Sequence, residues 1–437
     1  MKLRLSLLCA ALALLTVPLF AGGSSESASA SKPASGSLAG TTIVFQTFLQ
    51  PGGSDTRGTA WGQIIDAFTK KTGINVKTSI LPWQQIDPQL ILSTQSGNPP
   101  DVSFVRDKAF AQDVQANALE PLDSYIQKDF TDATQKDFLF WDQVGLANGH
   151  RYALRMHYIP EALYIRKDLL KKTGLPAPQT WDDFVKVGQA LSKQGVIGYL
   201  FAGSSAQPAQ LDFLQPMIEG RGGHVLSSDG QAAFQQQAGI DTYQFLKSLV
   251  FKYGVTPSSA TTTKYNDVDD AFKAGQVGMI IEGVHLYGTF AKALGADKIE
   301  LARIPGVTAG HPSPTDVSGW NLGIPRGSKH ADAAWQFIKF STGDAAQLIY
   351  TKVGGQLPVR KSLLDNPYFK SPEGAVAAWA LKYMRDAGQL AVAPKTYQQL
   401  NEDVAVALQK VLSDPNSNVT AILDQAAKQY DATVAAQ

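Results

Sequence analysis

The sequence predicts an α/β fold of two lobes, each a mainly parallel sheet flanked by helices. Three observations support this prediction. The 437 residues exceed the length at which a single hydrophobic core usually stops growing. After residue 40, segments with strand periodicity alternate with segments with helical periodicity. Strands separated by helices favour parallel pairing with right-handed crossovers.

The first 23 residues have the pattern of a secretory leader. Lys2 and Arg4 precede the apolar segment LSLLCAALALLTVPLF, and small residues from Ala21 follow it. We expect a signal peptide over residues 1–23 and export to the periplasm or the cell surface. An uncleaved anchor is the alternative, which the short and abruptly ended apolar segment disfavours.

Cys9, the only cysteine, lies inside the apolar segment of the leader. A lipid-attachment cysteine would follow that segment, so we do not expect a lipid anchor. The exported chain would lack thiols, which excludes disulfides and cysteine-based metal sites. Residues 24–40 begin with SSESASASKPASGS, a Ser- and Ala-rich stretch that predicts a flexible tether.

Composition and charge are those of an ordinary globular protein. The chain is 44% hydrophobic and 18% charged, with a formal charge of +1. A charge of that size does not attract nucleic acid or anionic lipid, and we expect neither as a partner. The six histidines lack the H-E-x-x-H spacing of a zinc site. We expect no metal and no cofactor.

The first half of the chain begins as strand, helix, strand, helix, strand. The segments with strand character are TTIVFQTF (41–48), INVKTSIL (74–81) and DVSFV (101–105). Apolar residues at helical spacing from Trp61 to Phe68 predict a helix that ends at Gly73. Residues 84–95 predict a second helix. In parallel sheets ligands bind beyond the carboxyl ends of the strands, so we expect the site there.

The second half continues the alternation and then becomes mainly helical. The stretch from Arg151 runs from strand into helix near Lys167, and Thr180 caps the next helix. Further helices are predicted around 182–193, 208–219, 231–252 and 267–274. Further strands are predicted at 277–283, 299–305 and 320–324, before a helical region over 331–437.

Several of these segments resemble one family in its own order. They are GNPPDVSFV, EALYIRKDLLKKTGL with PQTWDDF, DDAFKAGQVGMIIEGVHLYG, SGWNLGIPRGSKHADAAWQFIKF and GGQLPVRKSLL. Together they resemble the extracellular solute-binding proteins of ABC transporters, the large sugar-binding family that includes maltose-binding protein. The resemblance spans nearly everything after the tether.

The resemblance implies the type II periplasmic-binding-protein fold, with two lobes, a multi-segment hinge and a cleft between the lobes. The implied segments are 41–157 with 302–345 for the N-terminal lobe and 158–301 with 346–437 for the C-terminal lobe. It implies a monomer that binds a carbohydrate and delivers it to a membrane permease driven by a cytoplasmic ATPase. Many relatives carry Trp where this chain has His285, so no relative's sugar preference is carried over.

A sugar site needs aromatic platforms and side chains that donate and accept hydrogen bonds in fixed directions. Trp320 ends a strand and is the first candidate platform, with a core position as the alternative. Trp83 with Gln84 follows the second strand. Arg106 and Asp107 follow the third strand, as ligand contacts or as a solvated pair.

The second lobe supplies the other candidate ligand-binding residues. Glu161 lies where the resemblance places the first crossing between lobes and a cleft carboxylate. Glu282 ends an apolar strand, where an unpaired charge would be costly. His285, Tyr164 and Tyr397 complete the set.

A secreted glycoside hydrolase or lyase that uses Glu161 and Glu282 is the alternative function. The adjacent pairs Asp182–Asp183 and Asp269–Asp270 indicate helix starts, because consecutive residues point to different faces of a helix. We therefore expect a binding protein without catalytic residues rather than an enzyme.

Overall fold

The computed structural model describes residues 37–436. The predicted leader and residues 24–36 of the predicted tether lie outside the described residues. From Leu38 onward the chain forms one compact unit. No helix within residues 37–436 is both long and apolar enough to cross a membrane.

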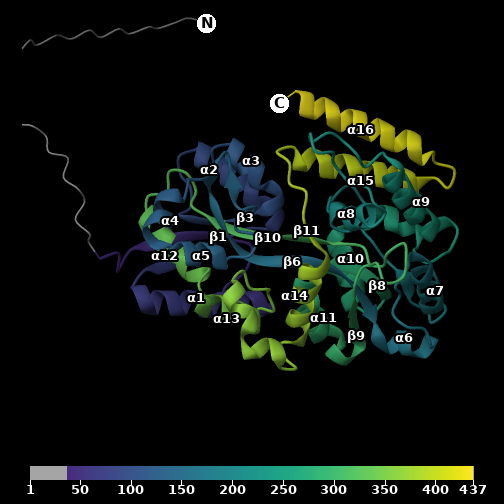
Figure 1. Ribbon diagram of the computed structural model, residues 1–437, viewed down its shortest axis with the longest axis horizontal. Coiled ribbons are helices and arrows are strands. Elements are labelled where there is room, and N and C mark those ends of the chain that lie inside the picture. The colour runs from purple at the N-terminus through teal and green to yellow at the C-terminus, as the bar shows by residue number, and fades with distance from the viewer. Residues whose placement is uncertain (1–36, 437) are drawn as a thin grey trace, which may run out of the picture. The chain divides into compact units, whose positions relative to one another are not determined.

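Nine of the described strands form one sheet in the order β2-β1-β3-β10-β6-β8-β7, with β11 beside β10 and β9 beside β6 (Figure 1). Their bounds are β1 (Thr42–Thr47), β2 (Asn75–Ile80), β3 (Val102–Arg106), β6 (Ala153–Arg166), β7 (Ile197–Tyr199), β8 (Val277–Gly283), β9 (Ile299–Ala302), β10 (Thr315–Gly323) and β11 (Gly388–Leu390). A separate hairpin consists of β4 (Leu146–Ala147) and β5 (His150–Arg151).

The pairing divides the sheet into two parallel regions joined by long antiparallel strands. β1 runs parallel to β2 and β3, and β7 runs parallel to β8. β6 connects the two regions: residues 153–160 pair antiparallel with β10, and residues 161–166 pair antiparallel with β8 and β9. β10 in turn pairs antiparallel with β3. A single strand of 14 residues therefore passes through both regions.

Sixteen α-helices cover the sheet within residues 37–436. Those on the side of β1 and β3 are α1 (Thr56–Thr72), α2 (Ile86–Gln95), α3 (Phe110–Gln115), α4 (Asp123–Asp129), α5 (Asp132–Asp137), α12 (Ala331–Ser341) and α13 (Asp344–Lys352), whereas α14 (Ala375–Ala387) contacts β10, β11 and β6. The others are α6 (Lys167–Thr173), α7 (Trp181–Ser192), α8 (Leu211–Glu219), α9 (Gln237–Phe251), α10 (Tyr265–Lys273), α11 (Tyr287–Leu294), α15 (Tyr397–Ser413) and α16 (Val419–Ala435).

Local sequence signals set the helix ends. The predicted stop at Gly73 is confirmed, because Gly73 ends α1 with a φ of 72°, which glycine adopts without steric cost. The predicted cap at Thr180 is also confirmed: its side chain accepts a hydrogen bond from the backbone N–H of Asp183 at 3.1 Å.

Two large hydrophobic cores form, one for each parallel region. In the first core Phe45 packs against Trp61 and Phe337, with ring centroids 5.0 and 5.3 Å apart. The second core lies between β8 and the helices α7, α8, α9, α15 and α16. Burying apolar area in two separate places gives two packed regions, which β6 and β10 join.

The packing of residues 346–384 differs from the predicted division of the chain into lobes. The segment 346–384, which contains most of α13 and most of α14, contributes Ala346, Tyr350, Ala380 and Met384 to the first core. Only α15 and α16 of the C-terminal region pack in the second core. The lobe boundaries stay a prediction, and this packing favours moving 346–384 from the C-terminal to the N-terminal lobe.

Candidate functional site

A cavity of about 240 Å³ lies between residues of the two cores. The first region contributes residues that directly follow the carboxyl ends of β1 and β3. The second region contributes residues of α8, α10 and the start of α15. β6 supplies the wall between them through His157, Ile159 and Glu161. The site therefore lies at the strand ends, where parallel sheets bind ligands.

Trp320 belongs both to the core and to the cavity wall. Its ring lies 4.5 Å from that of Phe48 and 5.7 Å from that of Phe104, and the side chain is only 8% exposed. It also lines the cavity. The neighbouring position must be glycine for a structural reason: a Cβ on Gly319 would lie 2.2 Å from the carbonyl oxygen of His157 on β6.

Trp83 forms a second aromatic wall, and this wall spans the two regions. It lies in a short 3₁₀ helix (Trp83–Gln85) after β2, half-buried, and lines the cavity. Its ring faces Tyr265 of α10 with centroids 6.3 Å apart at an interplanar angle of 71°. The guanidinium of Arg106 lies 5.6 Å from the Trp83 ring. Such cation–π contacts help to fix the ring.

Arg106 and Asp107 line the cavity and each has a partner that holds it. The Nε of Arg106 donates to Asp87 at 3.1 Å, and Asp107 accepts from Arg155 at 3.2 Å. Asp87 and Arg155 are buried, so they hold these two side chains in place. A side chain fixed in advance loses less conformational entropy when it contacts a ligand.

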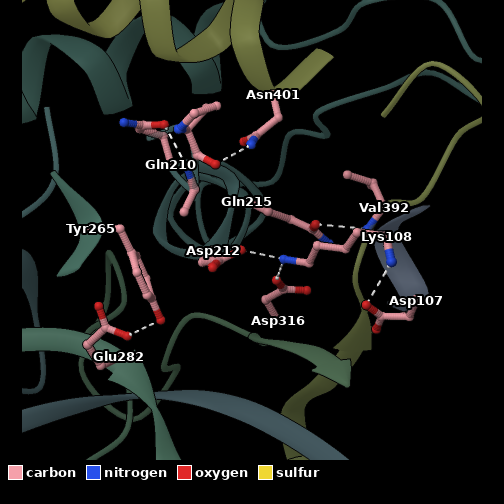
Figure 2. Close-up of polar contacts among 12 residues, drawn as sticks. Asp107, Lys108, Gln210, Asp212, Gln215, Tyr265, Glu282, Asp316, Val392 and Asn401 are labelled. Atoms are coloured by element: carbon pink, nitrogen blue, oxygen red, sulfur yellow. Dashed lines mark hydrogen bonds and ion pairs between the residues drawn. The ribbon is translucent and has the colours of Figure 1, made fainter. Parts of the chain in front are cut away.

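Lys108 is the central cation of the site, and the sequence analysis did not identify it. Its ammonium donates to Asp316 of β10 at 3.0 Å and to Asp212 of α8 (Figure 2). Burial would lower the pKa of Lys108, but the two carboxylates outweigh burial and raise it well above its ordinary value. Lys108 thus links the first region to a helix of the second.

Glu161 is a buried carboxylate in the cavity wall. The residue is 3% exposed, and its side chain makes no hydrogen bond to another residue within 37–436. Burial, followed by the charges of Asp212 and Asp316, raises its pKa well above the ordinary value. Its face of β6 is set by register, because Glu161 pairs with Gly283.

Two acids of the second region lie near Tyr265. Glu282 accepts a hydrogen bond from the Tyr265 hydroxyl at 2.7 Å, lies beside the hydroxyl end of that residue and is outside the cavity lining (Figure 2). Asp269 of α10 lines the cavity, and burial raises its pKa to about 7. One carboxylate oxygen of Asp269 is buried without a hydrogen-bond partner among the described residues.

The other predicted residues divide between the cavity and the core. His285 lines the cavity, and burial lowers its pKa to about 3, which keeps the imidazole neutral. Tyr397 also lines it, with its ring 6.0 Å from the ammonium of Lys108. Tyr164 does not reach the cavity: it is fully buried, and its hydroxyl donates to the Gly283 carbonyl at 3.0 Å. Gln84 is half-buried outside the lining.

The structure thus brings together most of the predicted site and adds residues to it. The predicted residues that line the cavity are Trp83, Arg106, Asp107, Glu161, His285, Trp320 and Tyr397. The lining residues that the sequence analysis missed include Arg57, Lys108, Asp212, Tyr265 and Asp269. Within residues 37–436 no group of three His, Cys, Asp or Glu side chains has an arrangement that could hold a metal ion.

Comparison with known proteins shows which family has this architecture. The family model for bacterial extracellular solute-binding proteins matches residues 52–348. The chain belongs to this family. A putative binding protein of Brucella abortus (strain 2308) is 24% identical over 374 residues, which cover 85% of this chain and 89% of the relative. The diacetylchitobiose binding protein of Streptomyces coelicolor is 24% identical over 68% of this chain and 69% of its own length.

Solved structures agree with the two-lobed fold of this solute-binding protein. Maltose-bound MalE3 of T. maritima superposes with a TM-score of 0.78 at 23% identity, covering 90% of this chain and 99% of that one. A solute-binding protein of Agrobacterium radiobacter K84 in complex with ribitol gives 0.76 at 19% identity, covering 90% and 98%. The predicted family resemblance and the predicted fold class are confirmed.

Membership of this family carries three general statements. The family consists of binding proteins, and its extracellular members act in the periplasm or at the cell surface. One named relative is a probable ABC transporter-binding protein, and two others are a diacetylchitobiose binding protein and an arabinooligosaccharide-binding protein. The family and the named relatives are substrate-binding proteins and not enzymes.

Proposed function

We propose that this solute-binding protein captures a carbohydrate in the cavity between its lobes and delivers it to an ABC permease driven by a cytoplasmic ATPase. It acts as an exported monomer and does not catalyse a reaction. The observation that carries the proposal is a cavity at the strand ends with indole rings from Trp83 and Trp320 and with fixed polar groups beside them. Flat rings match the C–H faces of a sugar, and fixed polar groups match its hydroxyls.

Ligand capture would proceed by closure of the lobes. Contacts from both lobes meet at the cavity, among them Lys108 with Asp212 and Trp83 with Tyr265. A carbohydrate that touches both walls stabilises the closed state by its differential affinity for that state. The closed, loaded form is the one that the permease would recognise.

The register of β6 and β8 disfavours the hydrolase or lyase alternative. Glu161 lies opposite Gly283, and Glu282 lies opposite Ala162. Residues directly opposite each other share a face, and successive residues alternate faces, so Glu161 and Glu282 start from opposite faces of the sheet. Glu282 also accepts a hydrogen bond from Tyr265 and does not line the cavity. An acid and base pair must flank one glycosidic bond, which this arrangement does not support.

Calorimetry and a reducing-end assay on the same samples test the proposal. The purified protein is mixed with maltose, ribitol and diacetylchitobiose, which are the ligands of similar proteins. Saturable heat without new reducing ends is the expected result for at least one of them. Sustained release of reducing ends would overturn the proposal in favour of an enzyme.

A matched pair of tryptophan variants locates the binding site. Trp83→Ala should weaken binding at least tenfold, because Trp83 lines the cavity. Trp141→Ala is the control: Trp141 is also half-buried, also packs on the first core and also has an arginine (Arg151) over its ring, but it lies outside the cavity lining. Equal losses in both variants would place the ligand elsewhere.

A further inference from the structure

The charges of the cavity are unequally paired. Its three cations each have a carboxylate partner: Arg57 pairs with Asp55 at 3.0 Å, and Arg106 pairs with Asp87 at 3.1 Å. The third cation, Lys108, has two such partners, described above. The salt bridges of these three cations are therefore made with acids other than Glu161 and Asp269.

Two carboxylates that line the same cavity have no cation of their own. Glu161 is 3% exposed, and although its backbone carbonyl accepts from Thr315, its carboxylate makes no hydrogen bond to another residue within 37–436. Asp269 has a buried oxygen without a partner in the same part of the chain. Lys273, on the same helix, forms its salt bridge with Asp270 at 2.6 Å. A buried, unpaired carboxylate is costly, and a cation that enters the cavity would remove that cost.

The aromatic residues around these acids favour the same kind of ligand. Tyr265 and Trp83 lie edge to face within the cavity wall, and Tyr397 and Trp320 also line it. The faces of such rings attract a cation, most strongly when water is excluded. The hydroxyl of Tyr265 is already committed to Glu282, so the ring remains available as a surface.

We propose that the solute bound in this cavity is an amino sugar, a carbohydrate that carries a protonated amine. The inference rests on the carbohydrate-binding function proposed above and narrows it. The ammonium has three donors, which match the free oxygens of Glu161 and Asp269. The ring hydroxyls face Arg106 and Asp107, and the apolar face of the sugar lies on an indole.

The size of the cavity favours a single ring. Its volume of about 240 Å³ lies below the range of about 300–1,000 Å³ typical of pockets for drug-sized ligands. A monosaccharide fits a cavity of this volume better than an oligosaccharide does. The expected solute is therefore a monosaccharide with a protonated amine.

Titration calorimetry with matched sugars tests the inference. D-glucosamine, D-galactosamine and D-mannosamine are each compared with glucose, galactose and mannose, which differ only at the amine-bearing carbon. We expect at least one amino sugar to bind ten times or more tightly than its neutral parent. A parent sugar that binds as tightly as its amino sugar, or more tightly, would overturn the inference.

Variants test which groups carry the selectivity. Glu161→Gln and Asp269→Asn should each reduce affinity for the preferred amino sugar about tenfold and change affinity for the neutral parent by less than twofold. Asp270→Asn is the control, since Asp270 is exposed, adjacent in sequence and paired with Lys273. Equal loss for both sugars in the Glu161 and Asp269 variants, or an equal loss in the control, would contradict the inference.

The outcomes separate this inference from the function on which it rests. Binding of maltose, ribitol or diacetylchitobiose without binding of any amino sugar overturns the inference and leaves the carbohydrate-binding function standing. An absence of saturable binding for every sugar overturns both. Circular dichroism of each variant confirms that a lost affinity is not a lost fold.

Discussion

The ammonium of Lys108 lies 3.0 Å from the carboxylate of Asp316, a residue that is 1% exposed. The same ammonium donates to Asp212 on α8. Lys108 follows β3, whereas Asp316 lies on β10. One buried cation therefore satisfies a carboxylate of the shared sheet and a carboxylate of a helix in the second region. Removing Lys108 and removing Asp212 should therefore have different effects on the protein.

Replacing Lys108 with methionine should strongly destabilise the protein. The variant keeps the length of the side chain but leaves the Asp316 carboxylate buried without its cation. Removing one partner of a buried pair costs about 3–5 kcal/mol. Urea unfolding at neutral pH measures the loss. Lys186→Met, which breaks an exposed pair with Asp183, should cost less than about 1 kcal/mol. A similar small loss for both variants would show that Lys108 does not stabilise Asp316.

Replacing Asp212 with asparagine should shift the empty protein towards an open form. Asp316 still pairs with Lys108 in this variant, so we expect the free energy of unfolding to change little. The charged contact between Lys108 and α8 is lost, which removes one interaction that favours closure. Small-angle scattering should show a larger radius of gyration without ligand. An unchanged radius in Asp212→Asn, equal to that of Asp270→Asn, would contradict this expectation.

Replacing the two cavity tryptophans with alanine should destabilise the protein to different extents. Trp320 packs against Phe48 and Phe104 in the first core, so Trp320→Ala should lose about 3–5 kcal/mol of stability and also weaken binding. Trp83 is half-buried and should lose clearly less stability for a comparable loss of affinity. Thermal unfolding of the empty proteins and calorimetry with the same sugar separate the two effects. Equal destabilisation would show that Trp83 is equally a core residue.

Stability should fall with rising pH through the titration of Asp269. Burial raises the pKa of Asp269 from 3.8 to about 7 in the folded protein. Between these values the folded state holds a proton that the unfolded state has released, so stability decreases as pH rises through this window. Chemical unfolding at pH 5 and pH 8 measures the difference. Asp269→Asn should show a smaller decrease than the parent protein, and an identical decrease would contradict the assignment.

The sequence predicted the parts of the site that lie in order along the sheet. Arg106 ends β3, Asp107 directly follows it and Trp83 lies shortly after β2, and the carboxyl ends of parallel strands meet at one edge. Strand alternation also explains one predicted residue that is absent from the cavity. Tyr164 lies opposite Ile280 of β8, on the face of the sheet that also carries Ala162 and Glu282. Tyr164 and Ile280 belong to the same hydrophobic core.

The residues that the sequence did not predict depend on contacts between distant elements. Asp212 and Tyr265 lie on α8 and α10, and which side of a helix faces a cavity depends on the packing of the whole lobe. Lys108 directly follows two predicted residues, but a lysine at such a position is usually exposed. Nothing local in the sequence indicates its two carboxylate partners, Asp212 and Asp316. The return of residues 346–384 to the first core is likewise a long-range packing event, with no local signal in the sequence.

The path of β6 couples the cavity to both regions of the sheet. The strand crosses from one core to the other, and its middle carries His157, Ile159 and Glu161 into the cavity wall. In the proposed closure, bending of β6 would displace the three side chains that line the cavity. Solute binding and lobe movement would then be coupled directly through one strand, without a chain of intervening residues.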